Sequence, residues 1–154
     1  MKILLFCCKG FEMMEFAPFI DVMGWARNDF GIGIDVVTAG FTKAVDSAFG
    51  VPVPVDQTYD EIRIDEYDAL PLGASGILRG RKATTYHLGD GRRQKQLASF
   101  GANVISDQEI VIDDHIITSF CPETAPGVAF KLLELMTDES TSHTVAEAMG
   151  FSLQ

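Results

Sequence analysis

The chain has 154 residues, a length typical of one domain, and 47% of them are hydrophobic. Twenty-two acidic against twelve basic residues give a formal net charge of −10, which argues against nucleic acid or an anionic membrane as a partner. Three cysteines, an odd number, favour free thiols in a reducing compartment, and no apolar run approaches the roughly 18 residues that span a bilayer. We therefore expect a single cytosolic domain over residues 1–154.

The first third of the chain predicts a β-α-β unit. The apolar run at 3–8 has the length of a strand and suits a central strand covered on both faces. Apolar residues at three- and four-residue spacing follow, which predicts a helix with Pro18 in its first turn and an end at 31–33. A second buried strand is expected at 34–39, parallel to the first.

Shorter elements make up the remainder. The alternating, proline-bearing segment 51–55 belongs at a sheet edge or in an excursion, because proline cannot donate to a ladder. A third strand begins at 67–70 and stops at Pro71. The remaining predicted elements are a helix at 74–78, a strand at 83–87, a helix at 92–100 ended by Gly101, a strand at 103–105, a hairpin at 110–118 about Asp113-Asp114, a helix from Pro122 to Met136 and a helix at 141–149.

Four segments give the chain a resemblance to a known family. They are KGFEMME at 9–15, IDEYDAL at 64–70, LRGRKATT at 78–85, and IITS at 116–119 with the helix that follows. In this order they resemble the ThiJ/PfpI family over nearly the whole chain, a family similar in fold to the class I glutamine amidotransferase domain. The resemblance implies an α/β fold, a flavodoxin-like three-layer sandwich with a mainly parallel central sheet, and a homodimer.

One block of the family is missing. After the segment matching 67–70, the family continues with a Pro-Gly-Gly turn that supplies oxyanion-hole amides, a helix, and a buried strand ending at the nucleophilic cysteine. Here Leu70 is joined directly to Pro71, so the sequence lacks this strand-helix-strand block. The open explanations are a true in-frame deletion, an artificially shortened protein, and a sequence from which the block is omitted.

Candidate site residues follow the first strand. The resemblance implies a glutamate that hydrogen-bonds the family's thiol, and Glu15 is the matching position. Burial would raise its pKa toward the working pH of a general base, whereas the alternative is an ordinary carboxylate in a first helical turn. We expect Cys8, Gly10 and Glu12 to line the crevice beyond the strand, where α/β sheets bind ligands. The alternatives are a core-filling Cys8 and a solvated Glu12.

Two residues later in the chain complete the candidates. His87 is the best match to a histidine that often lies near the family's cysteine, and its alternative is a packing or surface role. Cys121 precedes Pro122 at the amino end of a helix, where unpaired amides stabilise a thiolate. It is a candidate substitute nucleophile or oxidation sensor, or else a half-buried structural residue. No Cys/His spacing resembles a metal site, and we expect no cofactor.

The resemblance implies a hydrolase, lyase or glyoxalase-like enzyme that uses cysteine and glutamate on small carbonyl or amide-like substrates. Some family members carry a label for thiazole monophosphate biosynthesis, and others are redox-sensing, chaperone-like proteins. Losing the nucleophile of such a unit costs on the order of 10⁶ in rate, so we expect negligible family chemistry if the sequence is complete. The alternative is a non-catalytic dimeric binding or redox-sensing module whose reactive thiol is Cys121 or Cys8. A nucleotide-binding protein is disfavoured, because no phosphate-cradling glycine loop follows the first strand.

Overall fold

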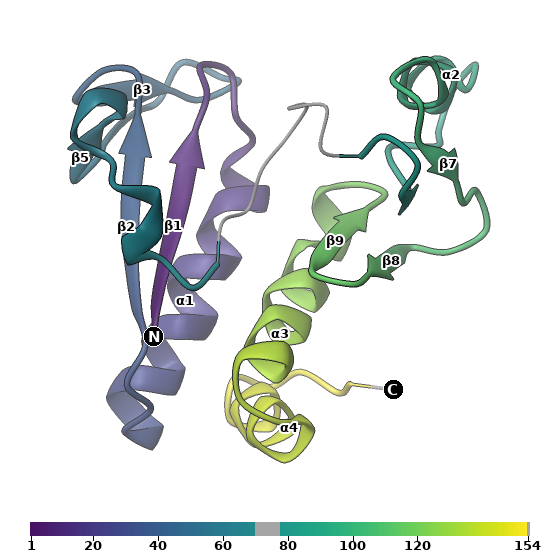
Figure 1. Cartoon of the computed structure of the whole chain (residues 1–154). Coiled ribbons are helices and arrows are strands. Elements are labelled where there is room, and N and C mark those ends of the chain that lie inside the picture. The colour runs from purple at the N-terminus through teal and green to yellow at the C-terminus, as the bar shows by residue number, and fades with distance from the viewer. Residues whose placement is uncertain (70–77, 154) are drawn as a thin grey trace. The chain divides into compact units, whose positions relative to one another are not determined.

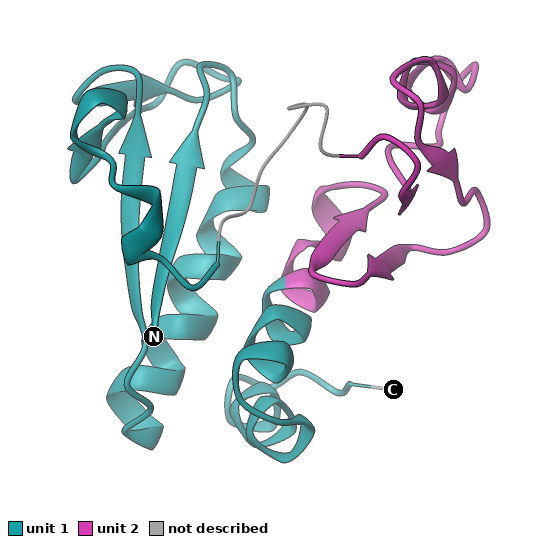
Figure 2. Ribbon diagram, in the orientation of Figure 1, with its two compact units in different colours: residues 1–72, 129–154 teal, residues 73–128 magenta. Residues whose placement is uncertain are grey.

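A computed structural model describes residues 1–69 and 78–153. The chain divides into two compact units (Figure 2). Unit 1 comprises residues 1–72 and 129–154, and unit 2 comprises residues 73–128; each is described by itself. The single domain over 1–154 stays a prediction. The junction at Leu70–Pro71 and almost all of the predicted helix at 74–78 lie outside the described residues.

Unit 1 is built on two long parallel strands. β1 (Lys2–Cys7) pairs with β2 (Asp35–Gly40) in parallel register along their whole length. The short strand β5 (Gln57–Thr58) continues the same parallel sheet on the far side of β2. The arrows of β1 and β2 point to the same end in Figure 1. Both predicted strands and their parallel arrangement are therefore confirmed, with bounds shifted by one residue.

β1 lies inside the sheet, as its continuous apolar run predicts. Ile3 and Leu4 are 0% and 1% exposed, so both faces of the strand are covered. Along its other edge, the amide of Leu4 donates to the carbonyl of Ala69, and the amide of Asp68 donates to the carbonyl of Lys2. The chain at 68–69 thus begins the predicted third strand beside β1. Residues from Leu70 onward lie outside the described part.

A small antiparallel ribbon leaves the main sheet between β2 and β5. β3 (Ala44–Asp46) pairs with β4 (Pro52–Pro54), and the two strands form a sheet of their own. Because the prolines of β4 cannot donate hydrogen bonds, the segment suits a two-stranded excursion rather than the interior of a sheet. The predicted excursion at 51–55 is confirmed.

Helix α1 (Met13–Phe30) connects β1 to β2 and ends where Gly31 adopts a left-handed φ of 68°. The expected position of Pro18 is wrong. The helix begins five residues before Pro18, which therefore lies inside the helix rather than in its first turn. At that position the ring has no N–H to give to the carbonyl of Met14, four residues earlier. The helix buries the side chains of Phe19, Val22, Met23 and Ala26.

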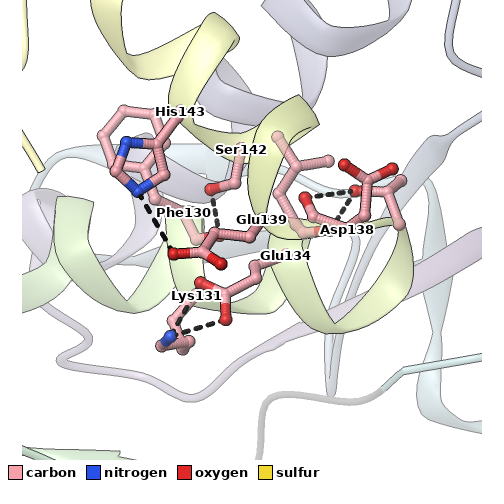
Figure 3. A network of polar contacts seen from close by, with 9 residues as sticks. Phe130, Lys131, Glu134, Asp138, Glu139, Ser142 and His143 are labelled. Atoms are coloured by element: carbon pink, nitrogen blue, oxygen red, sulfur yellow. Dashed lines mark hydrogen bonds and ion pairs between the residues drawn. The ribbon is translucent and has the colours of Figure 1, made fainter.

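Two further helices contribute to unit 1. α3 (Ala125–Met136) is followed closely by α4 (Glu139–Ala148), which contacts α1. The carboxylate of Asp138 caps α4 by accepting from the Thr141 amide at 2.9 Å and from the Thr141 hydroxyl at 3.0 Å. The buried Ser142 hydroxyl donates to the Phe130 carbonyl at 2.8 Å and ties α4 to α3 (Figure 3). The predicted last helix is confirmed, but it begins two residues earlier.

Unit 2 contains a second, smaller β-α-β unit and a hairpin. β6 (Lys82–Ala83) and β7 (Asn103–Val104) are parallel and are connected through α2 (Arg92–Ser99). α2 is followed by Gly101 at φ 88°, which confirms the predicted end. The strand expected at 83–87 is wrong beyond Ala83: Thr84 gives its amide to the Thr118 hydroxyl rather than to a ladder.

The hairpin consists of β8 (Ile110–Asp113) and β9 (Ile116–Ser119). Asp113 pairs with Ile116, so the turn is formed by Asp114 and His115 rather than by Asp113-Asp114. Asp114 adopts φ 58°, a left-handed conformation that aspartate tolerates better than most residues. The hairpin itself is confirmed. Together, the described elements confirm an α/β protein with a parallel sheet.

Candidate functional site

A tight turn follows β1 and positions the candidate residues of unit 1. The amide of Phe11 donates to the carbonyl of Cys8 at 3.0 Å, which closes the turn. Gly10 adopts φ 85° at the third position, a conformation that type II turns require and that glycine supplies without strain. Its amide donates to the carbonyl of Asp46 at 2.8 Å. Gly10 therefore shapes the loop, and its own N–H is already used.

Glu12 and Glu15 occupy the start of α1. Glu12 is the N-cap residue: its carbonyl accepts from the amides of Glu15 and Phe16, but its side chain makes no capping hydrogen bond. Burial raises the pKa of the Glu15 carboxyl above its ordinary value, and the negative charge of Glu12 raises it further. By surface area Glu15 is nevertheless an exposed residue. Glu15 is thus a partly desolvated carboxylate that holds its proton more tightly than usual.

The two adjacent cysteines differ in exposure: Cys7 is the last residue of β1, and Cys8 follows the strand. Cys7 is buried in a cluster with Val45 and Val55, against which Phe11 and Phe16 pack. Burial, together with the nearby Cys8, raises the pKa of the Cys7 thiol to about 11. Cys8 is exposed. Cys7 therefore fills the core, whereas the alternative that Cys8 is a core-filling residue is wrong.

Gly40 is a structural residue of this region that the sequence patterns do not identify. It ends β2 opposite Cys7. A Cβ atom placed on Gly40 would lie 2.5 Å from Cγ2 of Val45 and 3.3 Å from the Cys7 carbonyl oxygen. The close approach of β3 to the ends of β1 and β2 therefore requires a residue without a side chain.

Unit 2 brings the other two candidates near one another through Phe120. The exposed His87 ring packs against the buried Phe120, with ring centroids 4.1 Å apart and an interplanar angle of 36°. The next residue, half-buried Cys121, precedes a 3₁₀ helix (Pro122–Thr124) that leads into α3. The Cys121 carbonyl accepts from the amide and the hydroxyl of Thr124. The contact with Phe120 supports the packing role of His87.

The structure thus places Cys8, Gly10, Glu12 and Glu15 in unit 1, and His87 and Cys121 in unit 2. That these six residues form one site stays a prediction. Within residues 1–69 and 78–153, no group of three or more His, Cys, Asp or Glu side chains could hold a metal ion. No helix in the same part of the chain is long and apolar enough to cross a membrane.

Several solved structures are similar to this one over nearly the whole chain. DJ-1 of Schizosaccharomyces pombe is 19% identical, with a TM-score of 0.79 over 99% of this chain and 100% of that chain. DJ-1beta of Drosophila melanogaster is 22% identical, with a TM-score of 0.80 over 99% and 98%. A mutant of a DJ-1 superfamily protein from Salmonella typhimurium is 18% identical, with a TM-score of 0.73 over 99% of both chains.

No protein-family profile matches the sequence, and no curated protein is similar to it in sequence. The chain has the DJ-1/PfpI fold, a flavodoxin-like α/β arrangement. The predicted resemblance to the ThiJ/PfpI family is therefore confirmed at the level of the fold. At these identities the similarity defines the fold alone.

Proposed function

We propose that this protein is a cytosolic, homodimeric member of the ThiJ/PfpI family that binds a small molecule beyond the carboxyl end of β1 and responds to oxidation through Cys8. The observation that carries the proposal is the pair of features flanking the turn after β1. Cys8 offers an exposed thiol on one side, and Glu15 offers a partly desolvated carboxylate on the other. Ligands of parallel α/β sheets bind at this end of the strands.

The family's cysteine chemistry is not part of this proposal. All three cysteines are in the described residues, and Cys7 is buried with a pKa of about 11, so it is almost entirely un-ionised at neutral pH. No hydrogen bond joins a thiol to the Glu15 carboxylate within residues 1–69 and 78–153. A nucleophile–base unit without its nucleophile loses on the order of 10⁶ in rate.

The raised pKa of Glu15 favours a second candidate function. A carboxylate that is more basic than usual suits a general base, and the family resemblance then implies a hydrolase, lyase or glyoxalase-like enzyme on small carbonyl or amide-like substrates. In this version Cys121 is the nucleophile and His87 assists proton transfer.

Thiol titration with a chromogenic disulfide at neutral pH tests the first function. We expect one fast-reacting thiol in the native protein, lost in Cys8→Ser and kept in Cys121→Ser, while urea-unfolded wild type shows three thiols. A fast thiol that persists in Cys8→Ser would refute the role of Cys8. Light scattering on a sizing column tests the homodimer.

Turnover of a small dicarbonyl separates the two functions. The first function predicts no turnover that depends on Glu15, so wild type and Glu15→Gln should behave alike. Turnover abolished both by Glu15→Gln and by Cys121→Ser would support the enzyme instead. Circular dichroism of each variant confirms that the fold is retained.

A further inference from the structure

Three aromatic rings gather where the parallel strands of unit 1 end. Phe6 is the penultimate residue of β1, Phe41 follows β2 directly, and Tyr59 follows β5 directly. Phe6 packs edge-to-face on Phe41 and on Tyr59, with ring centroids 5.1 and 6.4 Å apart. Phe41 and Tyr59 lie 5.7 Å apart at an interplanar angle of 35°. We call Phe6, Phe41 and Tyr59 the aromatic cluster.

The aromatic cluster is not a part of the core. Phe41 and Tyr59 are 66% and 61% exposed, whereas Phe11 and Phe16 pack against the buried Cys7 cluster. Exposed apolar groups that are scattered singly need no explanation, but a contiguous exposed aromatic patch marks an interaction surface. Its position at the carboxyl ends of three parallel strands is where α/β sheets bind their ligands.

The charge beside the aromatic cluster is negative. Three carboxylates lie within three residues of Tyr59: Asp56, Asp60 and Glu61. Glu61 pairs with Lys43, so these three carboxylates and one lysine leave a net charge of −2. The later carboxylates Glu66 and Asp68 contact Lys2 at the opposite, amino end of β1. A phosphate or carboxylate group would be repelled here. The faces of aromatic rings carry partial negative charge as well, so rings and carboxylates together attract a cation.

A contact of this kind already exists at the opposite, amino end of β1. The Lys2 ammonium lies 4.8 Å from the ring centroid of Tyr67 and also pairs with the neighbouring Glu66. Tyr59 and the adjacent Asp60 repeat this combination of a ring beside a carboxylate. Among the described residues, no cation lies over the rings of the aromatic cluster.

We propose that the aromatic cluster docks an arginine-bearing segment of a partner protein, with the guanidinium plane stacked on Phe41 and Tyr59 and the charge balanced by the nearby Asp56 and Asp60. Arginine fits better than lysine, because its planar, weakly hydrated group stacks on ring faces while donating to carboxylates. Neither Cys8 nor Glu15 belongs to the aromatic cluster, so substitutions that test the docking surface leave both residues of the proposed function unchanged.

Calorimetric titration with a peptide of alternating glycine and arginine tests the proposal on the full chain at physiological salt. We expect binding of the arginine peptide, weaker binding when lysine replaces arginine, and none when the neutral isostere citrulline replaces it. Phe41→Ala and Tyr59→Ala should each weaken binding about tenfold. Phe41→Leu, which keeps apolar bulk without a ring face, should lose as much as Phe41→Ala.

Phe49→Ala is the matched control, because Phe49 is 86% exposed but belongs to no ring pair of the described residues. It should bind the arginine peptide like wild type. Equal affinity in wild type, Phe41→Ala and Phe49→Ala would mean general attraction to an acidic protein and would overturn the proposal, as would a failure of wild type to bind. Thermal melts confirm that each variant is folded, and Tyr59→Leu replaces Tyr59→Ala if the latter unfolds.

Discussion

Replacing Gly40 by alanine tests how tightly β3 packs against the ends of the two long strands. An added Cβ would lie 2.5 Å from Cγ2 of Val45, whereas non-bonded carbons prefer about 3.5–4.0 Å. The branched, buried Val45 side chain, 4% exposed, therefore has to move by about 1 Å or push β3 away. Overpacking of this kind costs about 1–3 kcal/mol.

A compensating gain arises in the unfolded state. Alanine restricts the unfolded chain more than glycine does, which stabilises the folded protein by about 0.4–1 kcal/mol where the backbone allows it. Gly40 is not among the residues with positive φ, so this gain applies. The net expectation for Gly40→Ala is a loss of about 1–2 kcal/mol of unfolding free energy. Gly33→Ala, whose Cβ would meet nothing within 4 Å, should cost nothing.

Urea unfolding followed by the fluorescence of Trp25 measures the effect, because this single tryptophan lies in α1 of the same unit. Val45→Ala alone removes two methyl groups and costs about 1.6 kcal/mol by transfer. In the Val45→Ala background the 2.5 Å clash is gone and only the 3.3 Å approach to the Cys7 carbonyl oxygen remains, so adding Gly40→Ala should cost much less than it does alone. Strictly additive losses in the double variant would refute the steric explanation.

Three further substitutions test individual polar groups. Burial raises the pKa of Glu15, so the folded state binds a proton more tightly and stability falls as the pH rises above the ordinary value of 4.5. Glu15→Gln should make the urea midpoint depend less on pH in that range. An unchanged pH dependence would contradict this. The amide and hydroxyl of Thr38 donate to Asp56 and lower its pKa, so this stabilisation is lost as the pH falls below the ordinary value of 3.8. Asp56→Ala should therefore unfold at a higher pH than wild type on acidification. An identical acid transition would exclude the effect. Asp138→Ala removes the cap on the Thr141 amide and should lower the unfolding free energy by about 1 kcal/mol, whereas Asp138→Asn should retain most of the stability. Equal losses of unfolding free energy in the two variants, measured in urea, would assign the effect to charge instead of capping.

Sequence patterns predict the long strands and the helix ends well, because these depend on local properties. The uninterrupted apolar run at 3–8 suits a strand that is covered on both faces, and the valine- and threonine-bearing segment 34–39 suits its neighbour. Gly31 and Gly101 end helices because glycine adopts the left-handed conformation freely. The start of α1 is harder to predict: Glu12 caps it without a side-chain hydrogen bond, so no serine, threonine or asparagine marks the boundary.

The candidate site depends on tertiary packing, which one sequence does not reveal. Cys7 ends β1 with a buried side chain, whereas Cys8 lies just beyond the strand and is exposed, and the exact end of a strand is not visible in the sequence. The threonine-rich segment after Ala83 has high strand propensity, but the Thr118 hydroxyl takes the amide of Thr84 instead. The aromatic cluster joins three segments far apart in the chain, so no spacing rule identifies it.

Pro18 gives the start of α1 a freedom that the rest of the helix lacks. Without an N–H at residue 18, the helix lacks the hydrogen bond that residue 18 would donate to the carbonyl of Met14, one of the bonds between its first and second turns. Glu15 sits on that loosened turn, while the residues from Phe19 to Ala26 stay anchored in the core. An incoming molecule can therefore move the Glu15 carboxylate without disturbing the buried residues of α1. The first turn of the helix is adaptable, while the rest of the helix stays rigid.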